Sequence, residues 1–545
     1  MKKTKKITAL MLTAAIAAGS LAGCGGGGNS TTPTTTASNS PTTTASSNTP
    51  TTTAAKDDNK PAEMPKITFQ AIDHQGGFFS TGNAEGHEEV LQRVKDYTGI
   101  DVEYIPVAND SLEEIVGVTL LDTKNLPMIM SWGGNLNATI ISAAKAGAFW
   151  NLEDYIFDAE KYPNLSKANK DVLKQITVDG HIIGLYRARP IGRNGLGYRY
   201  DWADKLGLSA PETVDDVYNM AKAFTEQDPD GDGQKNTYGF CLCKYTGPID
   251  IIQTWFGAGN GWVEKDGQLI PSHMTDEYWE GVNYVKKMYD EGLVYSDWAI
   301  RDTNTWADGV KNGECGLYLD VLDGSRRIWD YFVNTPIPSV NGDETASMAL
   351  VGAIAKEKGG KPVTMATSGM NGFFMITKGA KTEADLEACL TYLDKMCDDE
   401  MLTLADHGLE GIGYEMQDGY LVDINTTWTL AQKPHTGLNQ TVCYIPNEAA
   451  LDPVVKKSPQ ALVEAEVKTK NVENAVFNPA VGYLAGSDTY ALNGATLDAA
   501  LKDARTQYIC GEIDEAGFRA AMDTWLAQGG QKIIDEINAL YQADK

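Results

Sequence analysis

The sequence has few of the residues on which much enzymatic and metal chemistry depends. Its 545 residues include six histidines and eight cysteines, and the cysteines form neither a C-x-x-C pair nor a zinc-type spacing. The G-x-S-x-G, H-E-x-x-H and P-loop motifs are absent. One S-x-x-K match, Ser142–Lys145, lacks the companion motifs of a penicillin-interacting enzyme. A histidine-dependent catalytic site therefore has little support.

Positive charge is also scarce. The chain carries 46 Lys and Arg residues against 74 Asp and Glu residues, which gives a formal net charge of −28. Because so acidic a body repels polyanions, we expect no binding to nucleic acid, and no binding to anionic lipid through general electrostatics.

Long apolar runs are missing except near the amino terminus. Lys2–Lys6 form a basic stretch, and Ile7–Ala18 form an apolar run that is too short to span a bilayer in a mature protein. Small residues then precede a single cysteine, Cys24, as in a bacterial lipobox. We therefore expect residues 1–23 to be a lipoprotein signal peptide and Cys24 to carry the lipid. Ordinary secretion with cleavage nearby is the alternative.

Residues 24–65 consist mostly of Gly, Ser, Thr, Pro, Ala and Asn. Such a segment cannot bury a hydrophobic core, so we predict a disordered, lipid-anchored tether with a reach of roughly 35 Å. A body held outside the cell in this way captures, processes or displays a molecule.

The folded sequence begins near Lys66. Apolar patterns predict strands at 66–72, 102–107 and 126–132, with segments of helical spacing between them. This alternation predicts a parallel sheet with crossover helices, whose ligands bind beyond the carboxyl ends of the strands. The side chains that follow these strand ends are Asp73, His74, Gln75 and Trp132.

Four arginines lie within residues 187–199, which is unusual in so acidic a chain. Two interpretations stay open: the arginines form ion pairs with surrounding carboxylates, or they line a cleft. The Gly and Pro residues of this segment suit a strand that crosses between two lobes.

The most specific motif is the acidic loop at residues 228–239, where carboxylates alternate with other residues and glycines permit a tight turn. A hard cation such as Ca²⁺ takes six to eight oxygen ligands from such a loop. The predicted ligands are Asp228, Asp230, Asp232, the main-chain carbonyl of Gln234 and the side chain of Asn236. An EF-hand has glutamate at the twelfth position, where this loop has Gly239. The metal would be structural, and a solvated acidic turn is the alternative.

The order of these features resembles the extracellular solute-binding protein family 1, in particular the LplA-like lipoproteins of ABC sugar importers. The resemblance extends over most of the chain from Lys66 onward. The segments that carry it are 126–130, 180–186, 204–208, 228–239, 313–318, 392–400 and 407–414.

The resemblance implies an α/β, periplasmic-binding-protein-like fold, in which two α/β lobes surround a hinge and a ligand cleft. The amino-terminal lobe would contain residues 66–190 and 370–430, and the carboxy-terminal lobe residues 191–369 and 431–545. It also implies Ca²⁺ at the acidic loop, an oligosaccharide in the cleft, and delivery of that sugar to ABC permease subunits. The protein would be a monomer without enzymatic activity, attached to the extracellular face of the membrane through its lipid alone.

Capture of a sugar requires flat rings and fixed polar groups, because a pyranose offers apolar faces and a rim of hydroxyl groups. The candidates for stacking are Trp132, Trp255 and Trp262, which lie beside glycines on predicted loops, with burial in the core as the alternative. The candidate hydroxyl partners are Asp73, Gln75, Arg187, Arg199, Asp320, Asn371 and Glu410. The arginines leave an acidic sugar such as a uronide open.

Two other function classes remain alternatives. A surface polysaccharide-processing enzyme would need paired carboxylates, which any chain this acidic can offer. A sugar-sensing binding module that is not coupled to import would share the same sequence features, since the partner that distinguishes it is encoded elsewhere.

Overall fold

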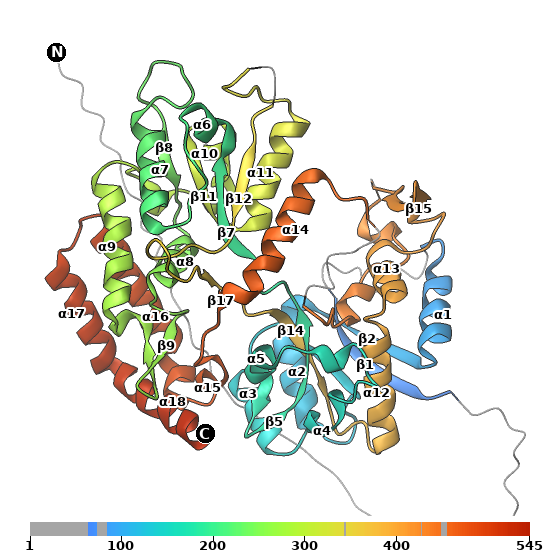
Figure 1. Ribbon diagram of the computed structural model, residues 1–545. Helices are drawn as coiled ribbons and strands as arrows, with labels where there is room; N and C mark the ends of the chain where they lie inside the picture. Colours follow the sequence, from blue (N-terminus) through green and yellow to red (C-terminus); the bar gives the residue numbers. More distant parts are fainter. Residues whose placement is uncertain (1–63, 74–83, 343–344, 427, 448–454) are drawn as a thin grey trace, which may run out of the picture. The chain divides into compact units, whose positions relative to one another are not determined.

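The computed structural model describes residues 64–73, 84–342, 345–426, 428–447 and 455–545 (Figure 1). The predicted signal peptide, most of the predicted tether, Cys24 and Gln75 lie outside these residues. Within the described part of the chain, no helix combines the length and the apolar character needed to cross a membrane.

The first part of the fold is a five-stranded sheet with the order β2-β1-β3-β14-β6. Its strands are β1 (Lys66–Asp73), β2 (Asp101–Ala108), β3 (Ile129–Trp132), β6 (Gly184–Ala188) and β14 (Met370–Ile376). Strand β1 pairs in parallel with β2 and β3, whereas β14 runs antiparallel to β3 and β6. The helices of this part are α1 (His87–Thr98), α2 (Leu112–Leu121), α3 (Ala138–Lys145), α12 (Glu383–Lys395) and α13 (Asp399–His407).

Local sequence signals explain where these helices begin and end. Helix α1 buries Val90 and Val94 on one face, and Gly99 ends it in the left-handed conformation at φ 72°. Helix α12 begins with a capping box in which the Thr382 and Asp385 side chains each accept a bond from the other residue's backbone N–H. Helix α12 packs on β1 and on α1.

The second part contains a four-stranded sheet with the order β12-β7-β11-β8. Its strands are β7 (Asn194–Arg199), β8 (Tyr238–Cys241), β11 (Cys315–Val321) and β12 (Met348–Val351). Strand β7 runs antiparallel to β11 and β12, and β8 pairs in parallel with β11. The longer helices here are α7 (Val214–Glu226), α8 (Gly247–Phe256), α9 (Asp276–Asp290), α11 (Leu322–Asn334), α14 (Pro459–Asn471), α16 (Asp488–Ile509), α17 (Glu515–Trp525) and α18 (Gln531–Ala543).

Shorter elements complete the described residues. The short α-helices are α4 (Glu153–Ile156), α5 (Lys170–Leu173), α6 (Tyr200–Lys205), α10 (Asp308–Lys311) and α15 (Val481–Leu484). The two-stranded pairs are β4 (Thr177–Val178) with β5 (His181–Ile182), β9 (Trp262–Lys265) with β10 (Gln268–Pro271), β13 (Thr364–Met365) with β17 (Ala475–Val476), and β15 (Tyr414–Gln417) with β16 (Tyr420–Asp423).

Each sheet lies in its own hydrophobic core. The first core includes Phe69, Phe373 and Phe374, and the second includes Trp202, Phe224 and Phe240. Leu438, Val442 and Ile445 pack into the first core. This segment therefore lies with the first sheet, whereas the resemblance places residues 431–545 in the carboxy-terminal lobe.

The two sheets are joined by connections that hydrogen-bond to one another. Residues 189–193 link β6 to β7, and residues 366–369 link β13 to β14. The Asn471 side chain donates to the carbonyl oxygens of Gly192 and Asn194, both at 2.9 Å. The Asn447 side chain donates to the carbonyl oxygens of Arg189 at 2.9 Å and Gly369 at 2.6 Å. These amide groups satisfy backbone acceptors that the sheets leave unpaired.

The seven cysteines among the described residues are free thiols. Six of them are buried and Cys510 is partly buried. Burial raises the pKa of Cys389 to about 12. The pKa of Cys241, which hydrogen-bonds to Cys315, is also raised well above its usual value.

Candidate functional site

Four predicted site residues lie along one edge of the first sheet. Strands β1 and β3 end at this edge, and because β14 is antiparallel to β3 and β6, β14 begins and β6 ends there as well. Phe373 pairs with both Trp132 and Tyr186, and Met370 pairs with Ala188. The four residues at this edge are Asp73, Trp132, Arg187 and Asn371.

A close backbone approach shapes this edge. Strand β14 has a register shift between Met370 and Phe373, and Gly372 within it has φ 79°. A Cβ atom on Gly372 would lie 2.1 Å from the carbonyl oxygen of Trp132, so only glycine fits. The bulge leaves the neighbouring Asn371 side chain exposed.

Asp73 and Trp132 are more enclosed than Asn371. The Asp73 side chain is buried, and the Trp132 indole N–H donates to the Asn135 carbonyl oxygen at 2.7 Å. Trp132 also belongs to the first hydrophobic core, with 8% of its surface exposed. Very little of this side chain therefore faces solvent.

The four arginines of residues 187–199 divide into two pairs. Arg199 forms a buried bidentate pair with Asp201, at 2.8 and 2.7 Å, and lies over the ring of Trp202. Arg193 pairs with Asp323 at 2.7 and 3.0 Å. The ion-pair interpretation therefore holds for Arg193 and Arg199, so the structure does not place Arg199 as a ligand group.

Arg187 and Arg189 differ, because neither guanidinium is within ion-pair distance of an Asp or Glu in the described part of the chain. Arg187 is 3% exposed, and one of its N–H groups donates to the Asn439 carbonyl oxygen at 3.3 Å. Its Nε has no hydrogen-bond partner. Burial, together with the charge of Arg189, lowers the pKa of Arg187 to about 10.

The second sheet has a comparable edge where β8 and β11 end and β7 begins. Asp320 lies near the end of β11, opposite Gly195. Burial raises the pKa of Asp320, although a hydrogen bond from the Val321 backbone acts in the opposite direction. The five residues 189–193 run from the first edge to the second, and such a segment spans at most about 18 Å. The two edges are therefore close neighbours.

Tyr245 is a ring at this second edge that the sequence analysis missed. It follows β8, is 48% exposed, and its ring centroid lies 6.1 Å from that of the buried Trp306. Trp306 in turn packs on Tyr318 of β11, and their ring centroids are 4.5 Å apart. The signal was present in the sequence, since Tyr245 follows a strand end just as Trp132 does.

The expectation that Trp255 and Trp262 lie on an open loop is wrong. Trp255 is in helix α8 and Trp262 begins β9, so the loop is limited to residues 257–261. The two indoles are 1% and 6% exposed and belong to the second core. Neither can stack on a sugar ring in this conformation.

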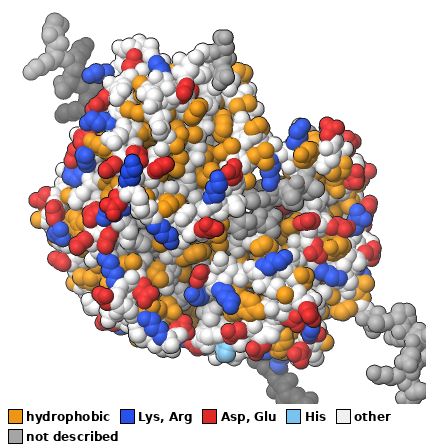
Figure 2. Space-filling model, in the orientation of Figure 1, with side chains coloured by type: hydrophobic (Ala, Val, Ile, Leu, Met, Phe, Trp, Pro, Cys, Tyr) orange, Lys and Arg blue, Asp and Glu red, His pale blue; other side chains and the backbone are white. Residues whose placement is uncertain are grey.

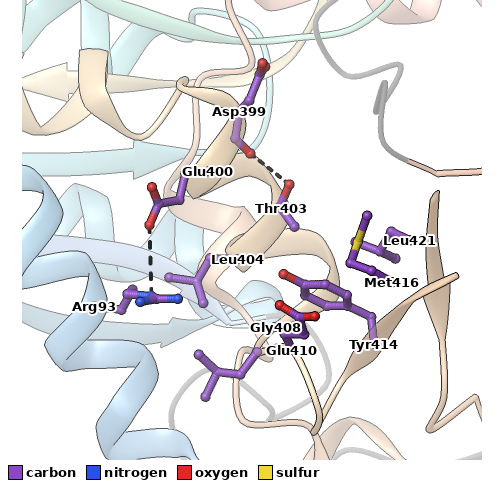
Figure 3. A pocket seen from close by; sticks show the side chains of 11 residues that line it. Arg93, Asp399, Glu400, Thr403, Leu404, Gly408, Glu410, Tyr414, Met416 and Leu421 are labelled. Carbon is purple, nitrogen blue, oxygen red and sulfur yellow. Dashed lines mark hydrogen bonds and ion pairs between the residues drawn. The ribbon is translucent and has the colours of Figure 1, made fainter. Parts of the chain in front are cut away.

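Glu410 lies apart from both strand edges, in a hollow of about 250 Å³ (Figure 3). Helices α1 and α13 and the β15–β16 hairpin form this hollow, with Arg93, Glu400 and Tyr414 around it. Glu410 itself is exposed. Its position gives no support to a role beside Asp73 and Asn371.

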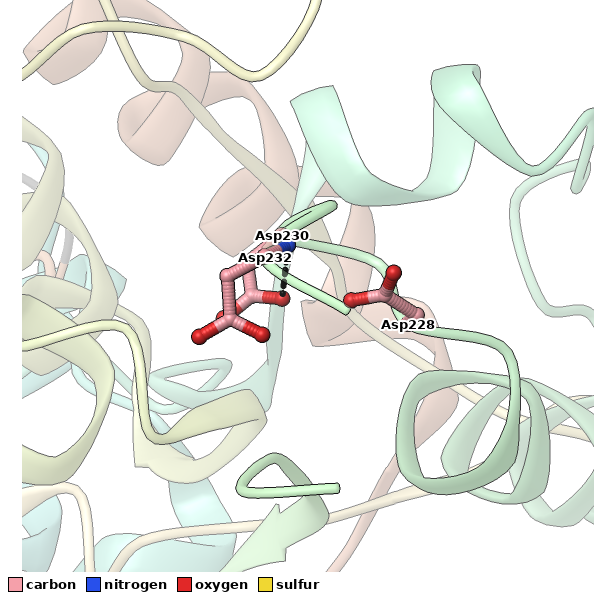
Figure 4. Close-up of side chains that lie close together, drawn as sticks. All are labelled: Asp228, Asp230 and Asp232. Atoms are coloured by element: carbon pink, nitrogen blue, oxygen red, sulfur yellow. Dashed lines mark hydrogen bonds between the residues drawn. The ribbon is translucent and has the colours of Figure 1, made fainter. Parts of the chain in front are cut away.

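The acidic loop brings three carboxylates together (Figure 4). Ligand oxygens of Asp228, Asp230 and Asp232 lie within 4.8 Å of one another. Burial and a hydrogen bond with Asp228 raise the pKa of Asp230, as expected where like charges are crowded. Asp232 accepts hydrogen bonds from the Gln234 backbone at 2.7 Å and the Asn236 side chain at 2.9 Å. This donor set fits a hard cation.

The twelfth position of the loop is closed to a ligand for a steric reason. Gly239 lies in β8 against helix α7, where a Cβ atom would be 2.2 Å from the Ala221 carbonyl oxygen. No glutamate can occupy this position without moving the helix. The packing of the second core therefore requires glycine at position 239, where an EF-hand has glutamate.

Comparisons with known proteins agree with these features. Residues 80–393 match the family model described as bacterial extracellular solute-binding protein. Lipoprotein LipO of Bacillus subtilis (strain 168) is 36% identical over 462 residues, which are 84% of this chain and 89% of LipO. The polygalacturonan/rhamnogalacturonan-binding protein YtcQ of the same strain is 29% identical over 454 residues, 82% of this chain and 86% of YtcQ.

A solved structure supports the fold. The HMO-binding, ABC-transporter-associated solute-binding protein from Bifidobacterium longum infantis ATCC 15697 superposes with a TM-score of 0.61 at 18% identity. The match covers 88% of this chain and 98% of that one. The α/β fold class expected from the sequence is thereby confirmed.

Proposed function

Because the chain belongs to the family of bacterial extracellular solute-binding proteins, we propose that it captures an oligosaccharide and delivers it to the permease subunits of an ABC transporter. The observation that carries this proposal is the meeting of two strand-end edges, which supply Asp73 and Asn371 on one side and Asp320 and Tyr245 on the other. Carboxylate and amide groups suit sugar hydroxyls, and an exposed ring suits the apolar face of a pyranose. The sugar-binding name of YtcQ agrees with this class of solute.

Binding can be tested with the protein from Lys66 onward. Isothermal titration against a panel of mono- and oligosaccharides should give saturable binding to one class, without product on long incubation. Turnover of a sugar would instead favour the polysaccharide-processing enzyme. If a strain without the ABC permease subunits binds the sugar but does not take it up, the result supports import. Unchanged uptake in that strain would favour the sensing module.

Tyr245→Ala tests the position of the site. Loss of one stacking ring should weaken binding about 3- to 10-fold. Because Tyr245 is half exposed, the melting temperature of the free protein should stay near that of the wild type. Tyr420→Ala on β16 is the matched control, since Tyr420 has a similar exposure but lies away from both strand edges. Equal affinity for both variants would remove Tyr245 from the site.

A calcium ion at the acidic loop is the second part of the proposal. Asp228, Asp230 and Asp232 would hold it, and the ion would neutralise their crowded charges and stabilise the link between α7 and β8. Calcium at 100 times its Kd should stabilise the fold by about 2.7 kcal/mol, and EDTA should reverse this. Asp230→Asn should lose most of the shift, whereas Glu473→Gln, an exposed acid outside the loop, should keep it. A melting temperature that is insensitive to both reagents would contradict the site.

The location follows from the predicted lipid anchor. We place a monomer on the extracellular face of the membrane, held by Cys24 and its tether. Cys24→Ser should release the protein into the medium, and retention of this variant in the membrane fraction would contradict the anchor. Gel filtration of the released form should give the mass of a single chain.

A further inference from the structure

Two of the four arginines in the crossing segment have no partner of opposite charge among the residues that the structure describes. Arg193 and Arg199 are each held by a bidentate carboxylate, which accounts for their presence in the fold. Arg187 and Arg189 have no such carboxylate among the described residues. Their hydrogen bonds go to the carbonyl oxygens of Asn439 and Ala188.

This lack of a partner is notable in a chain with 74 acidic residues. Acidic side chains are spread over the molecular face drawn in Figure 2, and cations there have many potential partners. An arginine is seldom fully buried without a counter-charge, because its desolvation is then not compensated. Within the described part of the chain, the Arg187 side chain nevertheless has this environment, and its Nε has no hydrogen-bond partner there.

The two arginines are surrounded by groups of both signs. Burial and then the charge of Arg189 lower the pKa of Arg187. Burial also lowers the pKa of Arg189, where Tyr444 acts in the raising direction and Arg193 adds a smaller lowering effect. The Asp406 carboxylate acts on both arginines from a distance, and it accepts a hydrogen bond from Tyr444 at 2.7 Å.

Arg187 and Arg189 lie at the proposed sugar-binding site. Arg187 lies at the end of β6, beside the bulge of β14 that carries Asn371. Arg189 begins the connection to the second sheet, and its backbone N–H donates to Gly369 at 2.9 Å. Arg189 is partly exposed whereas Arg187 is buried, so Arg189 can contact a solute while Arg187 supplies charge behind it.

We propose that Arg187 and Arg189 form an anion subsite that selects an acidic saccharide, with a uronate carboxylate as the group that it recognises. This inference rests on the proposed function and adds the class of sugar to it. A planar guanidinium matches the two oxygens of a carboxylate, which a neutral hydroxyl rim does not offer. The anion would supply the counter-charge that the described residues do not place beside these guanidiniums.

The test compares a trigalacturonate with its fully methyl-esterified form, which has the same length and linkage but no charge. Titration calorimetry should show the acid binding at least about 10-fold more tightly than the ester. Arg189→Gln should weaken binding of the acid about 10- to 100-fold and leave the ester unchanged. Arg189→Lys should give an intermediate loss, because it keeps the charge but not the planar fork. Free acetate and galacturonate monomer, tested alone, show whether a carboxylate without the oligosaccharide suffices.

The control is Arg519→Gln, which makes the same charge change at an exposed ion pair with Glu515. It should bind the acid like the wild type. Equal affinity for acid and ester, an Arg189→Gln variant like the control, or binding of neutral oligosaccharides in preference to uronides would each overturn the anion subsite and leave the proposed function intact. Failure of every saccharide to bind would overturn the proposed function itself. Tight binding of free acetate would show an anion site that does not select sugars, and would also overturn the inference.

Discussion

Asp323 anchors a buried cluster of charges at the point where the chain crosses into the second sheet. Its carboxylate accepts hydrogen bonds from Arg193 at 2.7 and 3.0 Å and from Arg327 at 2.6 Å, and Lys468 of α14 lies 3.6 Å away. Asp323 thus ties the crossing segment to α11 and α14. Asp323→Asn keeps the shape of the side chain but removes the charge that holds these three cations together.

The size of the loss follows from burial. Removing one partner of a buried ion pair costs about 3–5 kcal/mol, since the remaining charge is left uncompensated. Asp323 and Lys468 are largely buried, but Arg193 is partly exposed and Arg327 mostly exposed. After the substitution, water can therefore solvate Arg193 and Arg327, and Lys468 keeps its ion pair with Glu464. We expect Asp323→Asn to lower the free energy of unfolding by about 3 kcal/mol, at the lower end of that range.

Urea unfolding followed by tryptophan fluorescence measures this loss as a lower midpoint at an unchanged slope. Arg327→Gln is the control: it removes a cation that is 60% exposed and leaves Arg193 and Lys468 on the carboxylate. Its cost should be below about 1 kcal/mol. An Asp323→Asn variant that unfolds with the midpoint of Arg327→Gln would refute the reasoning, because the buried carboxylate would then contribute no more than an exposed pair.

Three further predictions concern pH, the core and the connections. Burial alone would raise the pKa of Asp323, but Arg193 and then Lys468 and Arg327 hold this pKa well below its usual range. Its stabilising effect should therefore be present above about pH 4 and be lost as the pH falls. In urea titrations, the midpoints of wild type and Asp323→Asn should approach each other progressively as the pH falls below about 4. Trp255→Ala should cost about 3–5 kcal/mol in the same assay, because the indole is fully buried, and weaker sugar binding at unchanged stability would contradict its place in the core. Asn471→Ala leaves the carbonyl oxygen of Gly192 without this donor, whereas the carbonyl oxygen of Asn194 keeps a hydrogen bond from the Thr364 side chain at 3.0 Å. The substitution should cost about 1–3 kcal/mol, and a variant as stable as wild type would show that water replaces the amide.

Features that depend on neighbouring residues could be predicted from the sequence. The strand from Lys66 and the helix from His87 to Gly99 follow from local apolar spacing and a left-handed glycine. The family was predicted correctly, because its motifs recur in order along the chain. The three aspartates of the acidic loop converge because a five-residue turn alone brings them together.

Features that depend on residues far apart in the sequence could not be predicted in this way. The sequence shows that glycines follow Trp255, but it does not show that α8 turns this indole into the second core. Arg199 finds its partner two residues away at Asp201, whereas the partner of Arg193 is 130 residues distant. The tertiary fold therefore decides which of the four arginines have an acidic partner among the described residues.

The buried cysteines make this protein convenient for measuring motion between the lobes. A maleimide dye reacts with a thiolate, and burial keeps native thiols such as Cys389 both protonated and out of reach. A cysteine introduced at an exposed position in each sheet's lobe, for example at Glu415 and at Asp290, would therefore be labelled ahead of the buried native thiols. Once the partly buried Cys510 has been replaced, fluorescence energy transfer between two such dyes would report opening and closing of single molecules.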